Sequence, residues 1–240
     1  MMKTDIIRRN PLRMMGYDTD DILFEGQFGA LMARAGIGKT AFLVQIALDK
    51  MLRDRNVLHI SLNEPVDKVC LWYEEVFRNI AADCGLTKLD PLWENILPKR
   101  FIMTFKAEGF SVPKLEERIT DLTEQDIFMP QALLIDGMSF DDTPRSTFTA
   151  LKDLAGRFGL PVWFTVRTHR HQSPPDGGMP FQMLNVADLF EVAISLRAQT
   201  DRIQVLPVKG GPAGGEKNPV VVLEPSTMLI IGDVREETAV

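Results

Sequence analysis

Eight residues at positions 33–40, ARAGIGKT, combine the residue types that bind phosphate groups. Backbone amides can approach a phosphate closely in a glycine-rich turn, because Gly36 and Gly38 have no side chain in the way and accept backbone angles that other residues avoid. The Lys39 ammonium group would bring positive charge to the β- and γ-phosphate oxygens, and the Thr40 hydroxyl could coordinate Mg²⁺. The octet therefore predicts a site for ATP and Mg²⁺.

The octet fits the P-loop pattern GxxxxGK[ST] at every fixed position except the first. Ala33 replaces the first glycine of the pattern, at a position that requires a small residue more than it requires glycine. The apolar run FGALM precedes the octet, and AFLVQIALDKML with helical spacing follows it. We expect nine residues to contact the nucleotide: Ala33, Arg34, Ala35, Gly36, Ile37, Gly38, Lys39, Thr40 and Ala41.

A second candidate group lies where a short apolar run ends in an acidic residue. The run ALLI at 132–135 is followed directly by Asp136. A P-loop site needs a carboxylate at the end of a nearby strand to hold the water shell of the Mg²⁺ ion. We therefore expect Thr40 and Asp136 to be the metal-binding residues.

The elements that must position these residues follow from hydrophobic periodicity. Strand-like runs at 28–33, 56–62, 101–105, 132–135 and 161–166 alternate with helix-like segments at 40–53, 68–83, 113–122 and 145–158. This alternation predicts an α/β fold with a mostly parallel sheet flanked by helices. Runs at 192–196, 203–208, 220–223 and 228–231 have no helices between them and predict an antiparallel C-terminal extension. We expect one domain over 1–240, with an N-terminal extension at 1–22 and a flexible loop at 167–182.

Composition excludes several classes of protein. A net charge of −6 disfavours nucleic acid as a partner, although local basic clusters such as Lys99–Arg100 keep it open. Cys70 and Cys84 are too isolated for a zinc site and are expected to be reduced packing thiols, which favours a cytoplasmic protein. We expect no signal peptide and no membrane span, because no apolar run approaches the roughly 20 residues that a span needs.

Three further sets of titratable residues lie outside the phosphate-binding and metal-binding motifs. His169 and His171 form a basic patch with Arg167 and Arg170, which could contact a nucleotide or a nucleic-acid backbone, although a solvated loop is favoured for the histidines. Asp141–Asp142 could form a second acidic cluster, but a turn that caps the following helix is favoured. His59 lies within a strand-like run and is expected to be packed in the core.

Several segments resemble the RecA-like ATPases, in particular the DnaB-type helicase core and the KaiC-type proteins. LMARAGIGKTAFLVQIA is similar to the first motif of the DnaB type, VLHISLNE to the strand that ends in the catalytic glutamate, and ALLIDGMS to the Walker B strand. PVWFTVRTHR resembles the sensor strand, and VKGGPAGGEKNPVVVLEP resembles the terminal hairpin. The resemblance covers about 28–231. It implies a RecA-like P-loop ATPase fold that binds ATP or ADP with Mg²⁺ and forms an oligomer, a hexamer by family analogy.

The resemblance is incomplete at the catalytic positions. Asn63 aligns best with the family's glutamate, which polarises the attacking water, and an amide cannot accept a proton. Glu64 follows one residue later and would point away in an extended strand, but KaiC-type proteins have adjacent glutamates here, which keeps Glu64 a candidate. Arg167 replaces the usual sensor glutamine. The hairpin keeps Lys209, but glycines occupy the place of its second basic residue, which implies slow hydrolysis.

Three functions remain in competition. The first is a Mg·ATP-binding ATPase with slow hydrolysis, in which Glu64 or Asn63 positions water and Arg167 senses the γ-phosphate. The second is a non-hydrolysing, nucleotide-gated switch or adaptor. The third is a DNA-dependent helicase or recombination accessory ATPase, which the acidic composition disfavours.

Overall fold

A computed structural model describes residues 2–17, 21–86, 89–169, 178–200, 202–212 and 221–231. In this part of the chain a single nine-stranded sheet has the strand order β3-β2-β4-β5-β1-β6-β7-β8-β9. The strands are β1 (Phe28–Ala33), β2 (Val57–Ser61), β3 (Arg100–Thr104), β4 (Ala132–Asp136), β5 (Val162–Arg167), β6 (Val192–Ala198), β7 (Ile203–Lys209), β8 (Val221–Leu223) and β9 (Ile230–Ile231).

The strands from β3 to β6 run parallel, and β7, β8 and β9 continue the sheet with antiparallel pairing. Every residue of β1, β2 and β4 is buried, which explains why these strands read as continuous apolar runs instead of alternating ones. The expected mostly parallel sheet with an antiparallel C-terminal part is confirmed.

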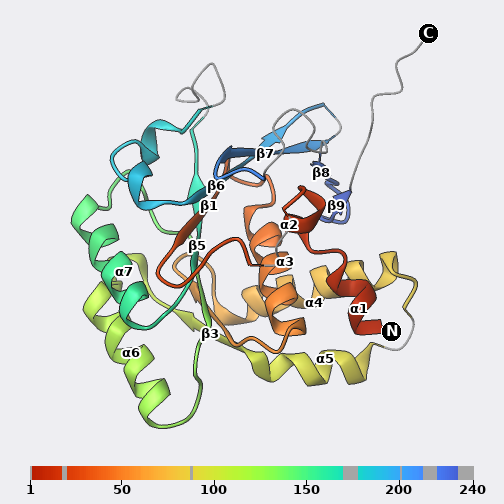
Figure 1. Cartoon of the computed structure of the whole chain (residues 1–240), viewed down its shortest axis with the longest axis horizontal. Coiled ribbons are helices and arrows are strands. Elements are labelled where there is room, and N and C mark those ends of the chain that lie inside the picture. Colours follow the sequence, from red (N-terminus) through yellow and green to blue (C-terminus); the bar gives the residue numbers. More distant parts are fainter. Residues whose placement is uncertain are drawn as a thin grey trace.

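Helices cover both faces of the sheet (Figure 1). One face packs against α1 (Met2–Ile7), α2 (Pro11–Met14), α3 (Lys39–Leu52), α4 (Val66–Asp83) and α5 (Asp90–Ile96). The other face packs against α6 (Val112–Glu124) and α7 (Arg145–Arg157), with short 3-10 helices η3 (Phe181–Met183) and η4 (Ala187–Leu189) near them. Two more 3-10 turns, η1 (Leu97–Lys99) and η2 (Ala107–Gly109), flank β3.

The N-terminal extension contains structure that the sequence interpretation did not expect. Asn10 begins α2, and its side-chain oxygen accepts a hydrogen bond from the Leu12 amide at 2.7 Å, with Pro11 in the first helical position. Ile6 and Leu12 are each 3% exposed and belong to the core that contains α3. This extension therefore packs on the helix that follows the octet.

The C-terminal part differs in one respect from the expectation. Strand β6 pairs in parallel with β1, and only its other edge is antiparallel, to β7. The segment before β6 returns the chain to the start of β1, where the Glu191 amide donates to the Phe28 carbonyl at 2.9 Å. The Glu191 carboxylate accepts from the Phe28 amide at 2.7 Å, so two hydrogen bonds join Glu191 to the first residue of β1.

The order of the central strands decides where the candidate site forms. Strand β5 lies between β1 and β4, with Ala33 in register with Arg167 and Ile135 in register with Phe164. Because parallel strands end at the same edge of a sheet, the octet after β1, Asp136 and Arg167 come together there. No helix in the described ranges has the length and apolar character that crossing a membrane requires.

Candidate functional site

The octet forms a tight turn that leads directly into α3. Gly36 and Gly38 have φ angles of +77° and +94°, in the left-handed region that glycine adopts without strain. A Cβ atom on Gly38 would also lie 2.8 Å from Leu223 Cδ2, so this position excludes other residues twice over. Gly38 begins the helix without a side-chain cap from any described residue. The first amides of α3 are therefore available to an anion.

Lys39 folds back over this turn. Its ammonium group donates hydrogen bonds to the Ala33 carbonyl at 3.0 Å and the Arg34 carbonyl at 2.9 Å. Burial lowers the pKa of Lys39 to about 8; the Asp136 carboxylate opposes this shift and the Arg167 guanidinium adds to it. A phosphate group beside Lys39 would favour its charged form.

Asp136 and Thr40 meet although they are 96 residues apart. The Thr40 hydroxyl donates to Asp136 Oδ2 at 2.8 Å. Thr165, in the middle of β5, donates its hydroxyl to Asp136 Oδ1 at 2.5 Å and accepts the Gly137 amide at 3.0 Å. Both oxygens of the carboxylate thus accept hydrogen bonds from hydroxyl groups, which hold Asp136 in one orientation beside the turn of the octet.

Asn63 and Glu64 lie in a turn after β2 and not in the strand. The Ser61 hydroxyl accepts the Glu64 amide at 3.1 Å and donates to the Glu64 carbonyl at 2.8 Å. Because β2 ends at Ser61, the alternation of an extended strand does not apply, and Asn63 and Glu64 both line the same cavity. The Glu64 carboxylate pairs with Lys68 at 2.9 Å, and the Asn63 amide donates to the Gly137 carbonyl at 3.2 Å.

Arg167, the last residue of β5, faces the same cavity and is exposed. It has no ion pair with any described residue. Two residues after Arg167, His169 Nε2 lies 2.9 Å from Asp141 Oδ2, so this side chain contacts the turn that follows β4. The favoured capping role of Asp141–Asp142 is wrong, because α7 begins at Arg145 after Pro144 and has no side-chain cap. Asp142 instead forms a turn with Ser139. Arg170 and His171 lie outside the described residues.

A cavity of about 490 Å³ joins these groups. The predicted residues that line it are Ala35, Asn63, Glu64, Lys39, Thr40, Asp136 and Arg167. Other residues predicted to contact the nucleotide are placed differently: Ala33 is buried at the end of β1, Ala41 is buried inside α3, and Arg34 and Ile37 face a second pocket. The arrangement offers amides and two cations to an anion and one carboxylate to a metal ion.

Sequence interpretation missed Thr165 and Ser61. Both are buried polar residues in apolar strands, at 2% and 1% exposure. A hydroxyl within a buried strand was the available signal, because such a group needs a hydrogen-bond partner. The predicted core position of His59 is confirmed, with 0% exposure and a contact of 3.0 Å from Nδ1 to the Tyr73 hydroxyl.

The residues present fit Mg²⁺ better than a metal that needs a cage of side chains. No group of three or more His, Cys, Asp or Glu side chains that could hold a metal occurs in the described ranges. Mg²⁺ is usually held by one or two protein ligands together with phosphate oxygens and water. One hydroxyl and one carboxylate, Thr40 and Asp136, meet that requirement.

Comparison with known proteins adds no assignment. No protein-family model matches the chain, and a search of curated proteins gave no match. The functional argument therefore depends on the chain's own residues and their geometry.

Proposed function

We propose that this chain binds ATP with Mg²⁺ at the octet 33–40, in a RecA-like P-loop fold, and hydrolyses it slowly. The observation that carries the proposal is the hydrogen bond of 2.8 Å between Thr40 and Asp136 at the edge of the cavity. A P-loop site requires one hydroxyl for the metal and one carboxylate for its water shell, side by side. Their meeting across 96 residues supports this function over a chance GKT sequence.

The turn and the start of α3 would bind the β-phosphate through backbone amides. Lys39 would exchange its two loop carbonyls for phosphate oxygens, which are stronger acceptors because they are charged. Bound Mg²⁺ would neutralise charge that develops on the phosphates. Thr165 would keep the Asp136 carboxylate aimed at that position.

Slow hydrolysis follows from the state of the candidate base. Glu64 lines the cavity, but Lys68 pairs with its carboxylate, and the Ser61 hydroxyl fixes its backbone. A general base must lie within hydrogen-bond reach of the attacking water and be free to accept its proton. Asn63 can orient a water molecule without accepting a proton. Arg167 would supply positive charge to the γ-phosphate from within the same chain.

The same observations favour a second candidate, a nucleotide-gated switch that does not turn over. If Glu64 stays paired with Lys68, the cavity retains the groups for binding and lacks a free base. An oligomer remains a proposal by analogy with RecA-like proteins. Lys209 weakens one part of that analogy, because its ammonium group already donates to the Ala187 carbonyl of its own chain at 2.8 Å.

Thermal unfolding with and without Mg·ATP tests the binding proposal. We expect the melting temperature of the wild-type protein to rise with ATP concentration, because a ligand that binds only the folded state stabilises it. Lys39→Ala should abolish the rise. Arg55→Ala, which removes an exposed cation at the opposite edge of the sheet, should retain it. An unchanged wild-type melting temperature at saturating ATP would refute the proposal.

Phosphate release separates the two candidates. With the binding established, a single-turnover measurement should show slow, Mg²⁺-dependent release of phosphate that Glu64→Gln eliminates. Binding without any release, in the wild type and in Asn63→Glu alike, would identify the switch.

A further inference from the structure

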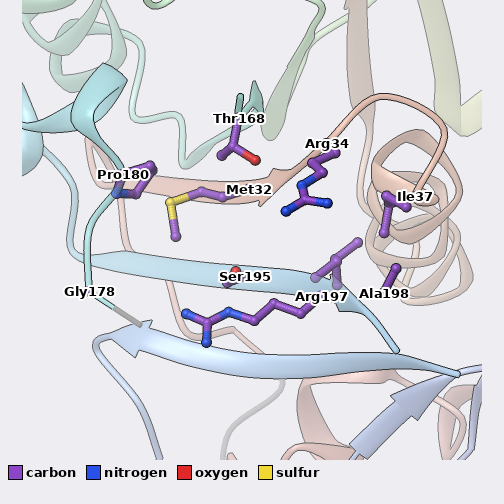
Figure 2. Close-up of a pocket in the computed structure, with 10 residues that line it drawn as sticks. Met32, Arg34, Ile37, Thr168, Gly178, Pro180, Ser195, Arg197 and Ala198 are labelled. Carbon is purple, nitrogen blue, oxygen red and sulfur yellow. The ribbon is translucent and has the colours of Figure 1, made fainter. Parts of the chain in front are cut away.

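A second pocket lies on the other side of the octet (Figure 2). Its volume is about 240 Å³, and it opens between the ends of β1, β5 and β6. Six of its residues matter for the argument: Met32, Arg34, Thr168, Pro180, Ser195 and Arg197. None of these residues belongs to the cavity described above. The pocket is therefore a separate candidate site.

The positions of two strand ends explain why two arginines, Arg34 and Arg197, line this pocket. Met32 on β1 is paired with Ser195 on the neighbouring strand β6. Arg197 lies two residues further along β6, and Arg34 is the first residue after β1, so both lie near the same edge of the sheet. In Figure 2 the Arg34 side chain points from the end of β1 toward β6, whereas the Arg197 guanidinium lies on the other side of β6 and points toward Gly178. The Thr168 amide donates to the Ala33 carbonyl at 3.0 Å and brings its own hydroxyl to the same edge.

The two guanidinium groups lack counter-charges within the described residues. Neither Arg34 nor Arg197 has an ion pair there, and no carboxylate is among the described residues that line the pocket. Other arginines of the chain have such partners: Arg145 forms a two-pronged pair with Asp188, and Arg157 forms one with Glu116. In a chain of net charge −6, a pocket with two unneutralised cations is suited to an anionic ligand.

We propose that this pocket binds the phosphate monoester group of a small organic molecule. A phosphate monoester carries about −1.5 to −2 charge at neutral pH, which two guanidinium groups would balance. A ligand with a single carboxylate carries less charge than the two guanidinium groups. The Ser195 and Thr168 hydroxyls can donate to the remaining oxygens. Met32 and Pro180 offer apolar contact to the organic part. The volume lies below the roughly 300–1,000 Å³ of drug-sized pockets, so the ligand is small.

Arg197 gives the cleaner test of this site. Arg34 belongs to the octet, and its carbonyl accepts a hydrogen bond from Lys39, so a change there would also disturb the first cavity. Arg197 is exposed on β6 and lines only the second pocket of the two. Replacement by glutamine removes its charge and keeps most of its length.

The experiment is isothermal titration calorimetry with phenyl phosphate, carried out on the Lys39→Ala protein. This background weakens phosphate binding at the octet, so the result does not depend on the ATP site. We expect binding that Arg197→Gln weakens by about ten- to a hundredfold, the effect of losing a charged hydrogen-bond donor. The matched control, Arg55→Gln at the opposite edge of the sheet, should leave the affinity unchanged.

Phthalate serves as the second probe, because it carries two carboxylates on a ring of the same size. Weaker binding of phthalate than of phenyl phosphate would support recognition of a phosphate monoester. Equal binding of the two would overturn that assignment, as would equal losses in Arg197→Gln and Arg55→Gln. Absence of phenyl phosphate binding, or binding only of a single-stranded oligonucleotide through Arg197, would overturn the proposal even if ATP binds at the octet.

Discussion

Replacing Thr165 by valine tests whether one buried hydroxyl organises the candidate metal site. Thr165 is 2% exposed, and its hydroxyl is bound at 2.5 Å to Asp136 and at 3.0 Å to the Gly137 amide. Valine has nearly the same shape, so the substitution removes the two hydrogen bonds without leaving a large void. Asp136 is 8% exposed, and its Oδ1 atom and the Gly137 amide would each lose this partner, while Oδ2 would keep the Thr40 hydroxyl.

The size of the effect follows from these contacts. A hydrogen bond to a charged group contributes about 1.5–3 kcal/mol, and leaving a buried amide unpaired costs about 1–3 kcal/mol. Because both bonds share one hydroxyl, we expect a combined loss of about 2–4 kcal/mol in the free energy of unfolding. For a chain of this size the melting temperature should fall by roughly 5–15 °C.

A second readout separates positioning from general destabilisation. If Thr165 aims Asp136 at the metal position, Thr165→Val should reduce the preference for Mg·ADP over ADP in EDTA, measured by calorimetry below the melting temperature. The matched control is Thr149→Val, which removes an exposed hydroxyl that bonds only to the Arg145 carbonyl of its own helix. That control should stay within about 0.5 kcal/mol of the wild type. A Thr165→Val protein as stable as the control would refute the reasoning.

Three other predictions follow from single contacts. Lys68→Ala should raise the single-turnover rate of phosphate release by freeing Glu64, and the gain should disappear in the double variant with Glu64→Gln; no change in the rate would contradict a masked base. Gly38→Ala should destabilise the protein more than Gly36→Ala in urea unfolding, because both have positive φ but only Gly38 has Leu223 at 2.8 Å; equal losses would count against this packing. Burial lowers the pKa of His59 to about 4, although the Asp136 carboxylate opposes this shift and Arg100 adds to it. The unfolded chain therefore binds the extra proton first as the pH falls below 6.5, so the free energy of unfolding should decline between pH 6.5 and 4, and less so in His59→Gln.

Most of the fold follows from the sequence because the central strands are buried on both faces. Such strands are continuous apolar runs, and the helices between them show clear periodicity, so β1, β2, β4 and β5 were predicted to within a residue or two. The helices α1, α2 and α5 were not predicted, because each spans fewer than eight residues and shows too little periodicity. The parallel direction of β6 was not predicted, because it depends on the hydrogen bond between Glu191 and Phe28. These residues are far apart in the sequence, and no local pattern encodes their contact.

The candidate site was predictable where a local motif exists and unpredictable where geometry depends on turns. Thr40 and Asp136 were expected at one metal site from the P-loop pattern together with the apolar run that ends at Asp136, and the structure brings the two together. The orientation of Glu64 was not, because the prediction extended β2 to residue 62, whereas the strand ends at Ser61 and the Ser61 hydroxyl forms a turn. Thr165 was overlooked because polar residues inside apolar strands have no fixed spacing from the P-loop motif.

The octet connects the two pockets through its backbone. Ala35 and Lys39 line the larger cavity, whereas Arg34 and Ile37 line the smaller one, so the loop separates the two sites. The positive φ angle of Gly36 lies between these residues and lets the chain reverse within one turn. The Arg34 carbonyl also accepts a hydrogen bond from the Lys39 ammonium group, and Lys39 must break this bond to bind phosphate. A ligand in the smaller pocket that moves the Arg34 backbone would therefore alter this bond.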